Sequence, residues 1–323
     1  MEVTPNQLIF GDMVRPSDEA STEPGSRYLL TVLVPTYRDD ASRLIQALAA
    51  CAGADETRLV IFDDGSRDPA LTEAMSSALM DYPGETRLLT SRKNVGRSEA
   101  RNRLLAEATT DWVLLLDADM LPDDHLFLAR YLDAVTRTTQ PSVVAGGFSL
   151  KRTRPTPEQT LHAMQSMRSE CLTAKDRLRD PGRFVFTSNI LVHREVLGAV
   201  AFDNGFKGWG WEDVDWGLNV ARQYPVLHID NTATHLGLDS DDALLAKYGS
   251  SAENFARLVS HHPASAKTMA LYRLARRLRL LGPVRRPLAK LFEAAARSHK
   301  LPGRIRLFAL KFYRAVIYAG ALS

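Results

Sequence analysis

The sequence from Trp112 to Asp119 is Trp-Val-Leu-Leu-Leu-Asp-Ala-Asp, an apolar run of five residues that ends in two aspartates. Such a run, bounded by polar residues, predicts a strand that is buried on both faces. In open α/β sheets, ligands bind beyond the carboxyl ends of the strands. Asp117 and Asp119 therefore occupy a predicted binding position, and paired oxygen ligands suit a divalent cation that also holds phosphate groups. A solvated Asp-rich turn is the alternative for this pair considered alone.

Apolar runs alternate with helical patterns on both sides of this stretch. Strands are predicted over 30–35, 59–62, 87–90 and 112–116, and helices over 41–50, 71–79 and 96–108. This alternation predicts a Rossmann-like α/β fold, a mostly parallel sheet flanked by helices. Pro35-Thr36-Tyr37 and Asp63-Asp64 follow the first two strands, so parallel strands would gather them at one edge with Asp117. No Gly-x-Gly-x-x-Gly follows the first strand, which argues against a dinucleotide-binding dehydrogenase.

Length and composition predict a globular enzyme with one large domain and an appendage. The chain has 323 residues, of which 45% are hydrophobic and 24% charged. Cys51 and Cys171 are its only cysteines, which predicts a reducing compartment and no disulfide framework. Residues 1–9 lack the pattern of a secretory signal, so we expect a cytoplasmic protein. Residues 1–27 are predicted to be a loose arm, 28–262 the catalytic domain and 263–323 a helical tail.

The tail differs sharply in charge from the rest of the chain. Residues 264–323 contain 14 of the 41 Lys and Arg but only Glu293 among the 38 acids, so their net charge is +13 and that of the remainder is 27 − 37 = −10. This asymmetry predicts an acidic body joined to a basic element that binds an anionic partner. Nucleic acid is disfavoured as that partner because no recognised nucleic-acid module accompanies the charge.

Two stretches of the tail predict association with an anionic membrane. Over 271–281 and 305–317, leucines and aromatics alternate with arginines at helical spacing, as in helices that lie in a bilayer interface. Lys311 and Arg314 interrupt the last apolar stretch, which is too short to span a membrane. We therefore expect peripheral association at the inner face of the membrane through 264–323. Basic helices packed back on the body are the alternative.

Several short motifs occur in an order that is typical of one enzyme family. They are Val34–Tyr37, Asp63–Ser66, Asn94–Arg97, Ala100–Asn102, Asp117–Asp119, Thr187–Ile190 and Gly208–Asp213. Together they resemble those of inverting family-2 glycosyltransferases with the GT-A nucleotide-sugar fold. The resemblance covers about Leu29 to His262.

The resemblance assigns roles to the residues at the predicted sheet edge. It implies that the nucleotide-sugar donor is held by Pro35, Thr36, Tyr37, Asp63, Asp64, Arg101 and Asp117. Asp119 would bind the metal that clamps the donor diphosphate. Tyr37 could equally be a core residue and Arg101 a surface cation.

The segment Gly208-Trp209-Gly210-Trp211-Glu212-Asp213 resembles the Gly-Trp-Gly-Gly-Glu-Asp loop of galactosyl- and chondroitin-type transferases. By that resemblance Asp213 is the catalytic base, Glu212 contacts the acceptor, and Trp209 forms a platform for a sugar. Trp211 replaces a glycine of the pattern, and we expect it to narrow the acceptor pocket. The alternative for the two acids is ordinary capping of a helix predicted over 212–223.

A histidine completes the predicted metal site. His235 follows the strand after the Glu-Asp helix, where similar enzymes place a metal-binding histidine, and His228 in the predicted strand 226–229 is the alternative. An imidazole beside a carboxylate suits Mn²⁺, and Mg²⁺ also fits. His261-His262 is interpreted as marking the end of the domain rather than a site.

These observations predict a metal-dependent inverting hexosyltransferase. We expect a UDP-linked donor and a hydroxyl acceptor that is a saccharide, a lipid-linked sugar or a small molecule, in polysaccharide or glycolipid synthesis. One alternative is a nucleotide-sugar-binding or scaffold protein without activity. Another is a haloacid-dehalogenase-like phosphatase that uses Asp117-Ala118-Asp119 as its nucleophile loop, although such loops usually open the domain and this one follows three predicted strands.

Overall fold

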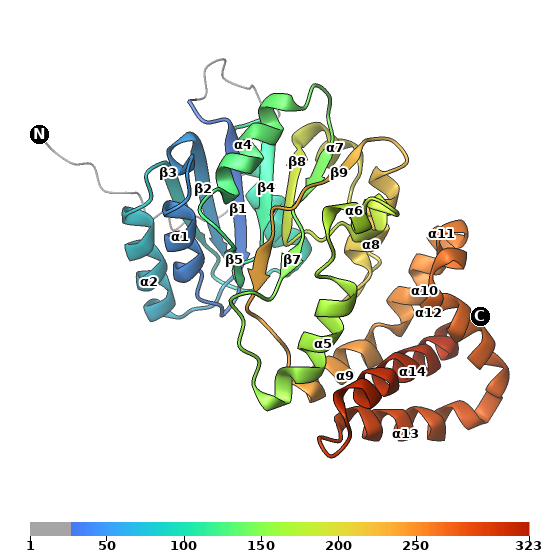
Figure 1. Ribbon diagram of the computed structural model, residues 1–323. Helices are drawn as coiled ribbons and strands as arrows, with labels where there is room; N and C mark the ends of the chain where they lie inside the picture. The colour runs from blue at the N-terminus through green and yellow to red at the C-terminus, as the bar shows by residue number, and fades with distance from the viewer. Residues whose placement is uncertain (1–26, 323) are drawn as a thin grey trace, which may run out of the picture. The chain divides into compact units, whose positions relative to one another are not determined.

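The computed structural model describes residues 27–322, which form two compact units (Figure 1). The sheet unit comprises the described residues up to Lys151 together with Phe186–Val200 and Tyr224–Leu236. The helical unit comprises Arg152–Val185, Ala201–Gln223 and the described residues from Gly237 onward. The predicted arm over 1–27 lies outside the described residues except for its last member. The predicted boundary at residue 263 stays a prediction, and the helical unit includes residues on both sides of it.

A seven-stranded sheet forms the centre of the sheet unit. Its strands are β1 (Leu30–Thr36), β2 (Thr57–Asp63), β3 (Glu85–Thr90), β4 (Trp112–Leu116), β6 (Val143–Ala145), β8 (Asn189–His193) and β9 (Val226–His228). Their order is β3-β2-β1-β4-β8-β6-β9, and β8 runs antiparallel to both of its neighbours. The other neighbouring pairs are parallel. The predicted α/β fold with a mostly parallel sheet is confirmed.

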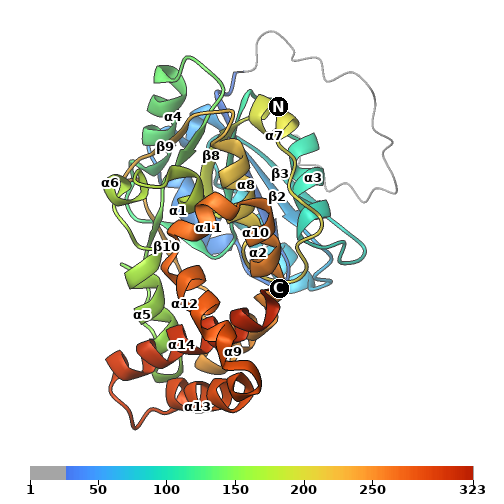
Figure 2. The ribbon, with the colours of Figure 1, turned by 90° about the vertical axis from the view of Figure 1, so that its right-hand side faces the viewer.

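Five helices flank this sheet. They are α1 (Ser42–Ala49), α2 (Pro69–Met80), α3 (Arg97–Ala106), α4 (Phe127–Arg137) and α7 (Arg194–Ala199). Figure 2 shows α3 and α4 on opposite sides of the sheet. A short 3-10 turn, η1 (Ala54–Glu56), precedes β2. Because helices cover both faces, β4 is buried along its whole length, as its unbroken apolar run predicts.

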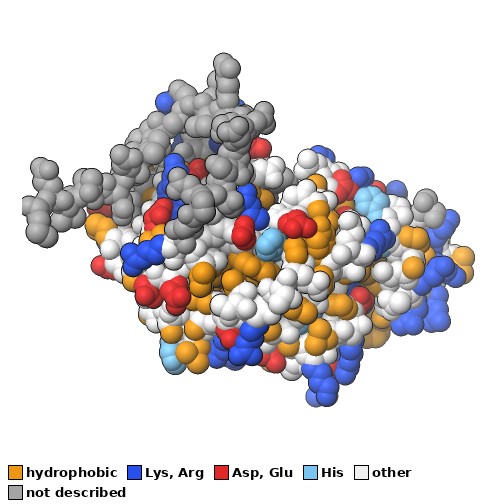
Figure 3. Space-filling model, turned by 90° about the horizontal axis from the view of Figure 1, so that it is seen from above, with side chains coloured by type: hydrophobic (Ala, Val, Ile, Leu, Met, Phe, Trp, Pro, Cys, Tyr) orange, Lys and Arg blue, Asp and Glu red, His pale blue; other side chains and the backbone are white. Residues whose placement is uncertain are grey.

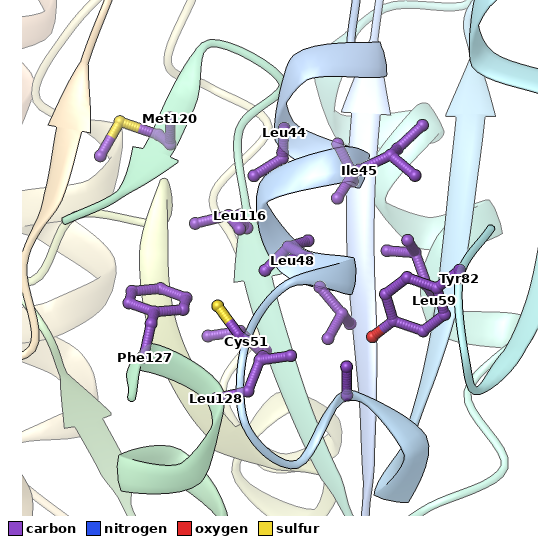
Figure 4. Close-up of a cluster of buried hydrophobic side chains, with 14 of the residues drawn as sticks. Leu44, Ile45, Leu48, Cys51, Leu59, Tyr82, Leu116, Met120, Phe127 and Leu128 are labelled. Atoms are coloured by element: carbon purple, nitrogen blue, oxygen red, sulfur yellow. The ribbon is translucent and has the colours of Figure 1, made fainter. Parts of the chain in front are cut away.

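The core of the sheet unit lies between α1, α4 and the sheet. Leu44, Ile45 and Leu48 share one face of α1 at the spacing of a single helical stripe, and each is at most 1% exposed. Figure 4 shows them with Phe127 and Leu128 of α4 in one cluster. Burial of each such side chain stabilises the fold by about 1.5–3 kcal/mol. This packing fixes the strand ends that carry the predicted site.

A second, three-stranded sheet was not predicted from the sequence. Its strands are β5 (Met120–Pro122), β7 (Phe148–Ser149) and β10 (Ala233–His235), in the order β5-β10-β7. Strands of two or three residues are too short to show an alternating pattern. β5 follows directly after Asp119, and its pairing with β10 brings distant parts of the chain together.

The helical unit contains the C-terminal helices. Its helices are α5 (Thr160–Ser169), α6 (Ala174–Arg177), α8 (Glu212–Val220), α9 (Asp241–Ser250), α10 (Ala252–His261), α11 (Pro263–Thr268), α12 (Ala270–Leu278), α13 (Arg285–Arg297) and α14 (Gly303–Ala321). The 3-10 turns η2 (Pro157–Gln159), η3 (Pro181–Phe184) and η4 (Arg279–Val284) complete it. Over residues 27–322, no helix combines the length and the apolar character needed to cross a membrane.

The last helix is the core element of this unit. α14 packs against α12 and α13 (Figure 2). Its Leu310, Val316 and Tyr318 are at most 2% exposed. Arg306 of α14 is also buried, where it pairs with Asp241. Most of the stretch 305–317 therefore packs inside the helical unit, which was the alternative to an interfacial helix for this part of the tail, while Ile305 and Phe308 are 47% and 54% exposed.

Candidate functional site

The order of strands in the main sheet reverses at β1. β1 lies between β2 and β4, so the chain builds one half of the sheet outward from β1 and then returns to start the other half. A crevice beyond the carboxyl ends of the strands at such a reversal is the usual binding position of α/β folds. β1 ends at Thr36 and β4 ends just before Asp117. The motifs predicted to hold the donor therefore surround this position.

Asp63, the last residue of β2, and Asp64, which follows it, are buried and hold loops. Asp64 is 4% exposed, and its carboxylate oxygens accept the backbone N–H groups of Val95 (2.7 Å) and Gly96 (2.9 Å). Asp63 accepts the backbone N–H of Ser66 at 3.0 Å. Asp64 thus fixes the loop that precedes α3. Both carboxylates therefore fix loops at the end of β2 through these backbone contacts.

The other predicted donor residues lie on the rim of the same edge. Thr36 donates its hydroxyl to the carbonyl of Asp39 at 2.6 Å. Pro35 is half-buried at the end of β1. Tyr37 is 39% exposed, with the Arg38 guanidinium 5.0 Å from its ring centroid. Tyr37 is thus outside the core, and its ring is accessible to a flat ligand.

Arg101 reaches across to the strand on the far side of β4. Its Nη2 donates to the hydroxyl of Thr187, 3.0 Å away, just before β8. Thr187 is buried, whereas Arg101 is only partly so. The backbone N–H of Asp117 donates to the carbonyl of the next residue, Ser188, at 3.3 Å. The 187–188 segment therefore links Arg101 to the aspartate pair.

Asp119 and His235 come together through the small sheet. In the antiparallel pairing of β5 and β10, His235 lies opposite Met120, the residue after Asp119. His235 Nε2 is 3.1 Å from Asp119 Oδ2, and the backbone N–H of Leu236 donates to the carbonyl of Asp119 at 2.9 Å. The two side chains are 25% and 34% exposed. A carboxylate oxygen and an imidazole nitrogen that converge in this way fit a Mn²⁺ or Mg²⁺ site. The alternative histidine, His228, is buried on β9.

Asp123 is an important residue that the sequence analysis did not identify. It follows β5 and accepts hydrogen bonds from the hydroxyls of Ser149, Thr232 and Thr234, while Lys151 Nζ is 3.0 Å from its Oδ2. Burial by itself raises the pKa of Asp123, but these hydrogen bonds outweigh burial and the pKa lies below its usual value. The ionised carboxylate thus ties together the segments that bring His235 to Asp119. Ser149, Thr232 and Thr234 lie far from Asp123 in the sequence, so no local sequence pattern indicated this cluster.

The motif Thr187–Ile190 also has a structural explanation. Asn189 is buried, accepts the hydroxyl of Tyr131 (2.7 Å), and donates to the carbonyls of Gly147 (2.9 Å) and Asn231 (3.0 Å). A Cβ atom at Gly146 would lie 2.2 Å from the Tyr131 hydroxyl, so glycine is required beside this network. Asn189 therefore aligns β8 with its neighbours.

In the helical unit, the predicted acceptor loop leads directly into α8. Glu212 and Asp213 occupy the first turn of α8, and both are half-buried. Trp211 precedes the helix with φ of 74°, a left-handed conformation that costs an L-residue about 1–2 kcal/mol. The backbone at Trp211 thus has a conformation that favours glycine, and glycine is the residue at this position in the Gly-Trp-Gly-Gly-Glu-Asp pattern that the loop resembles.

Packing of the indole compensates for this strain. The ring of Trp211 lies 4.9 Å from that of Phe255, and its Nε1 donates to the Tyr318 hydroxyl at 3.3 Å. Trp209 packs edge-on against Tyr248 at 5.4 Å, with Lys247 Nζ 5.8 Å from its ring. Both tryptophans attach the loop to the helices behind it. Their roles as acceptor contacts stay predictions.

A single buried asparagine clamps the same loop. The Asn254 amide nitrogen lies within hydrogen-bond distance of the carbonyls of Lys207 (2.9 Å), Gly210 (3.1 Å) and Trp209 (3.3 Å). Its Oδ1 accepts the backbone N–H of Lys207 at 3.1 Å. Asn254 is 5% exposed and lies at the start of α10. One side chain thus fixes the backbone that precedes Glu212, which no local sequence pattern indicated.

We expect Asn254→Ala to destabilise the helical unit by about 1–3 kcal/mol, because it leaves buried backbone groups without partners. Turnover should fall as well, since the loop leads directly to Asp213. Urea unfolding and initial rates would measure the two effects. Asn204→Ala changes an exposed asparagine of the same 201–211 segment and should shift stability by no more than about 0.5 kcal/mol. Equal losses in both variants would contradict the clamp.

A buried network anchors the same first turn of α8. Asp215, 2% exposed, accepts hydrogen bonds from His261 Nδ1 (2.8 Å) and His262 Nε2 (2.9 Å) on one carboxylate oxygen. Arg222 lies 2.9 Å from His262 Nδ1, and because arginine only donates, that nitrogen accepts and Nε2 carries the proton. Asp215, His261 and His262 offer metal-ligand atoms that lie within 4.8 Å of one another. The donating arginine instead favours a hydrogen-bonded anchor, since metal-binding histidines usually donate their second N–H to an acceptor.

This anchor predicts a pH dependence of stability. Burial lowers the pKa of His262 more than the neighbouring Asp215 raises it. Below about pH 6.5, His262 therefore binds a proton in the unfolded chain but not yet in the folded chain. The free energy of unfolding is consequently at its full value above that pH and falls as the pH drops toward the pKa of His262 in the folded chain. His262→Gln keeps one donor and one acceptor, and its unfolding free energy should depend less steeply on pH between about pH 5 and 7. An unchanged slope would contradict this assignment.

The mostly parallel sheet flanked by helices is the fold of GT-A glycosyltransferases. Comparison with protein families gives the same result: residues 31–200 match the model described as glycosyl transferase family 2. The chain belongs to this family. Membership of the glycosyltransferase family favours neither the haloacid-dehalogenase-like phosphatase nor the scaffold protein without activity.

Two curated relatives are a chondroitin synthase and a glucosyltransferase. The chain is 27% identical over 225 residues to a chondroitin synthase of Pasteurella multocida, covering 59% of this chain and 23% of that protein. It is 24% identical over 265 residues to a validoxylamine A glucosyltransferase of Streptomyces hygroscopicus, covering 73% of this chain and 57% of that protein. The chain thus spans less than two thirds of the length of these relatives.

The fold is shared with a solved transferase of very different sequence. A mannosyltransferase of Pyrobaculum calidifontis, described in complex with GDP-Man and Mn²⁺, matches with a TM-score of 0.54 and 17% identity. The match covers 94% of this chain and 89% of that protein. At 17% identity this likeness shows that the two proteins share a fold.

Proposed function

We propose that this glycosyltransferase is metal-dependent and inverting, and that it moves a hexose from a UDP-linked donor to a hydroxyl acceptor. The observation that carries the proposal is the approach of His235 to Asp119, 3.1 Å apart at the end of the sheet where the strand order reverses. Two ligands of this chemistry beside the strand ends proposed to bind the donor are what a metal-assisted diphosphate departure needs. The Mn²⁺ complex of the Pyrobaculum mannosyltransferase agrees with this choice of cofactor.

The residues of the sheet unit bind and orient the donor in this proposal. Pro35, Thr36 and Tyr37 flank the base, and Asp63 and Asp64 hold the loops around it. Arg101 and Asp117 contact the nucleotide. Asp119 and His235 hold a divalent cation, whose chemistry when bound is to neutralise the charge of the leaving diphosphate.

The residues of the helical unit act on the acceptor. Asp213 takes the proton from the attacking hydroxyl, and Glu212 orients the acceptor. The hydroxyl oxygen forms the new glycosidic bond while the bond to the diphosphate breaks, so a single displacement inverts the anomeric carbon. Trp209 and Trp211 line the acceptor side. A saccharide, a lipid-linked sugar or a small hydroxyl compound fits this chemistry, and membrane association through 264–323 would suit the second of these.

The proposal is tested by a donor panel on the wild-type protein. UDP-, GDP- and TDP-sugars are each added with and without Mn²⁺, and thermal stability and slow release of free nucleotide are measured. We expect one donor class to stabilise the protein and to be hydrolysed only with the metal. Hydrolysis at the same rate with and without Mn²⁺, or no response to any donor, would contradict the proposal.

A further inference from the structure

The turn η4 between α12 and α13 carries an exposed apolar tip, defined as Leu280, Leu281 and Val284. Leu280 is 89% exposed, Val284 57% and Leu281 38%. Gly282 has a φ of +52°, and a Cβ atom placed there would meet no atom within 4 Å. Isolated surface leucines are ordinary, but three such side chains within five residues form a projecting apolar patch. The tip thus costs free energy in water unless something covers it.

Hydrogen bonds hold this turn in place. Arg285 Nε donates to the carbonyl of Gly282 at 3.0 Å, and its Nη1 donates to the carbonyl of Ala319 in α14 at 2.6 Å. Ala275 in the preceding helix is fully buried. The tip is therefore presented on a fixed support, and little conformational entropy is lost when a partner covers it.

Exposed basic residues flank the tip in the sequence on both sides. The exposed cations nearest to it in sequence are Arg276, Arg277, Arg279, Arg286 and Lys290. No Asp or Glu occurs between residues 254 and 292. Figure 3 shows Lys and Arg side chains beside hydrophobic ones at its right-hand end. Two other arginines of the tail are engaged inside the unit: Arg306 pairs with Asp241, and Arg314 Cζ lies 3.8 Å from the Tyr248 ring centroid.

We propose that the apolar tip inserts into the interface of an anionic membrane while the flanking arginines contact the lipid headgroups. An exposed apolar tip flanked in sequence by exposed cations matches an acidic lipid surface in both apolar character and charge. A second copy of the chain would bring like charges together, which disfavours self-association through this turn. The inference deepens only the membrane part of the proposed function. It places membrane contact on η4 instead of on the long faces of the tail helices.

The experiment measures cosedimentation of the full chain with phosphatidylcholine vesicles that contain either no or about one-third phosphatidylserine. We expect binding to the acidic vesicles only, weakened by salt. Leu280→Ser should weaken it about tenfold, because a mostly exposed leucine loses its burial in lipid without cost to folding. Arg277→Gln with Arg279→Gln should weaken it by a similar factor.

The end of α6 provides matched controls, because it exposes a leucine and two cations: Lys175, Leu178 and Arg179. Leu178→Ser, and Lys175→Gln with Arg179→Gln, should bind as the wild type does. No binding of the wild type to acidic vesicles, or equal binding of Leu280→Ser, would overturn the proposal. A wild-type dimer that Leu280→Ser dissociates in analytical ultracentrifugation would assign the tip to self-association. Metal-dependent nucleotide release without vesicles should be unchanged in all tip variants, so failure of the transferase proposal would be seen separately.

Discussion

Replacing Asp213 by Asn is expected to lower turnover by about 10²- to 10⁴-fold, the usual contribution of a positioned general base. Asn keeps the shape of the side chain but cannot accept the proton of the acceptor hydroxyl. Donor binding should be unchanged, because the residues proposed to bind the donor belong to the sheet unit. Single-turnover rates and donor-induced thermal shifts measure the two properties separately.

Stability should barely change in the same variant. An acidic residue in the first turn of a helix contributes about 0.3–1 kcal/mol, and α8 also carries Glu212 and Asp215 there. Asp242→Asn removes an acid from the first turn of α9 and is the matched control, with turnover close to that of the wild type. Turnover by Asp213→Asn near the wild-type rate would remove Asp213 from this role.

Replacing Asp119 by Ala is expected to abolish the metal-dependent response to the donor. The variant loses one of the two converging ligands, so a nucleotide-sugar with Mn²⁺ should no longer raise its melting temperature above that with the nucleotide-sugar alone. Turnover should fall by about 10²-fold or more, since a metal supplies several kcal/mol of stabilisation to the departing diphosphate. His235→Gln should raise the Mn²⁺ concentration needed for half-maximal activity.

A matched aspartate lies at the other end of the same strand. Asp111 is exposed and directly precedes β4, whereas Asp119 follows it. Asp111→Ala should keep both the metal response and the turnover. If Asp119→Ala retained a Mn²⁺-dependent shift of the wild-type size, the metal would have to bind elsewhere.

The sequence could predict the main sheet because its strands are determined by local patterns. The apolar run of β4 and the alternation around it depend on neighbours in the chain, and the observed strand agrees with the predicted range 112–116. The small sheet was missed for the same reason, since β5, β7 and β10 are held together by contacts between distant segments. β8 was recognised only as a motif, although it is an antiparallel member of the main sheet.

The tail shows where charge and periodicity mislead. The stretch 305–317 has the alternation of an interfacial helix, but α14 buries residues on several of its faces against α12 and α13. An amphipathic pattern shows that one face is apolar and leaves open what covers it. The exposed tip at η4 became evident only once the burial of each side chain was known.

The sequence by itself determined the fold class, the family and the residue types of the candidate site, because these depend on local runs and on motifs with a fixed order. Only the tertiary structure decided how His235 meets Asp119, how Asp123 and Asn254 hold the segments around the site, and which part of the basic tail is exposed. Each of these depends on residues far apart in the chain, and a hydrogen bond or a buried contact between such residues leaves no pattern in the sequence near either of them.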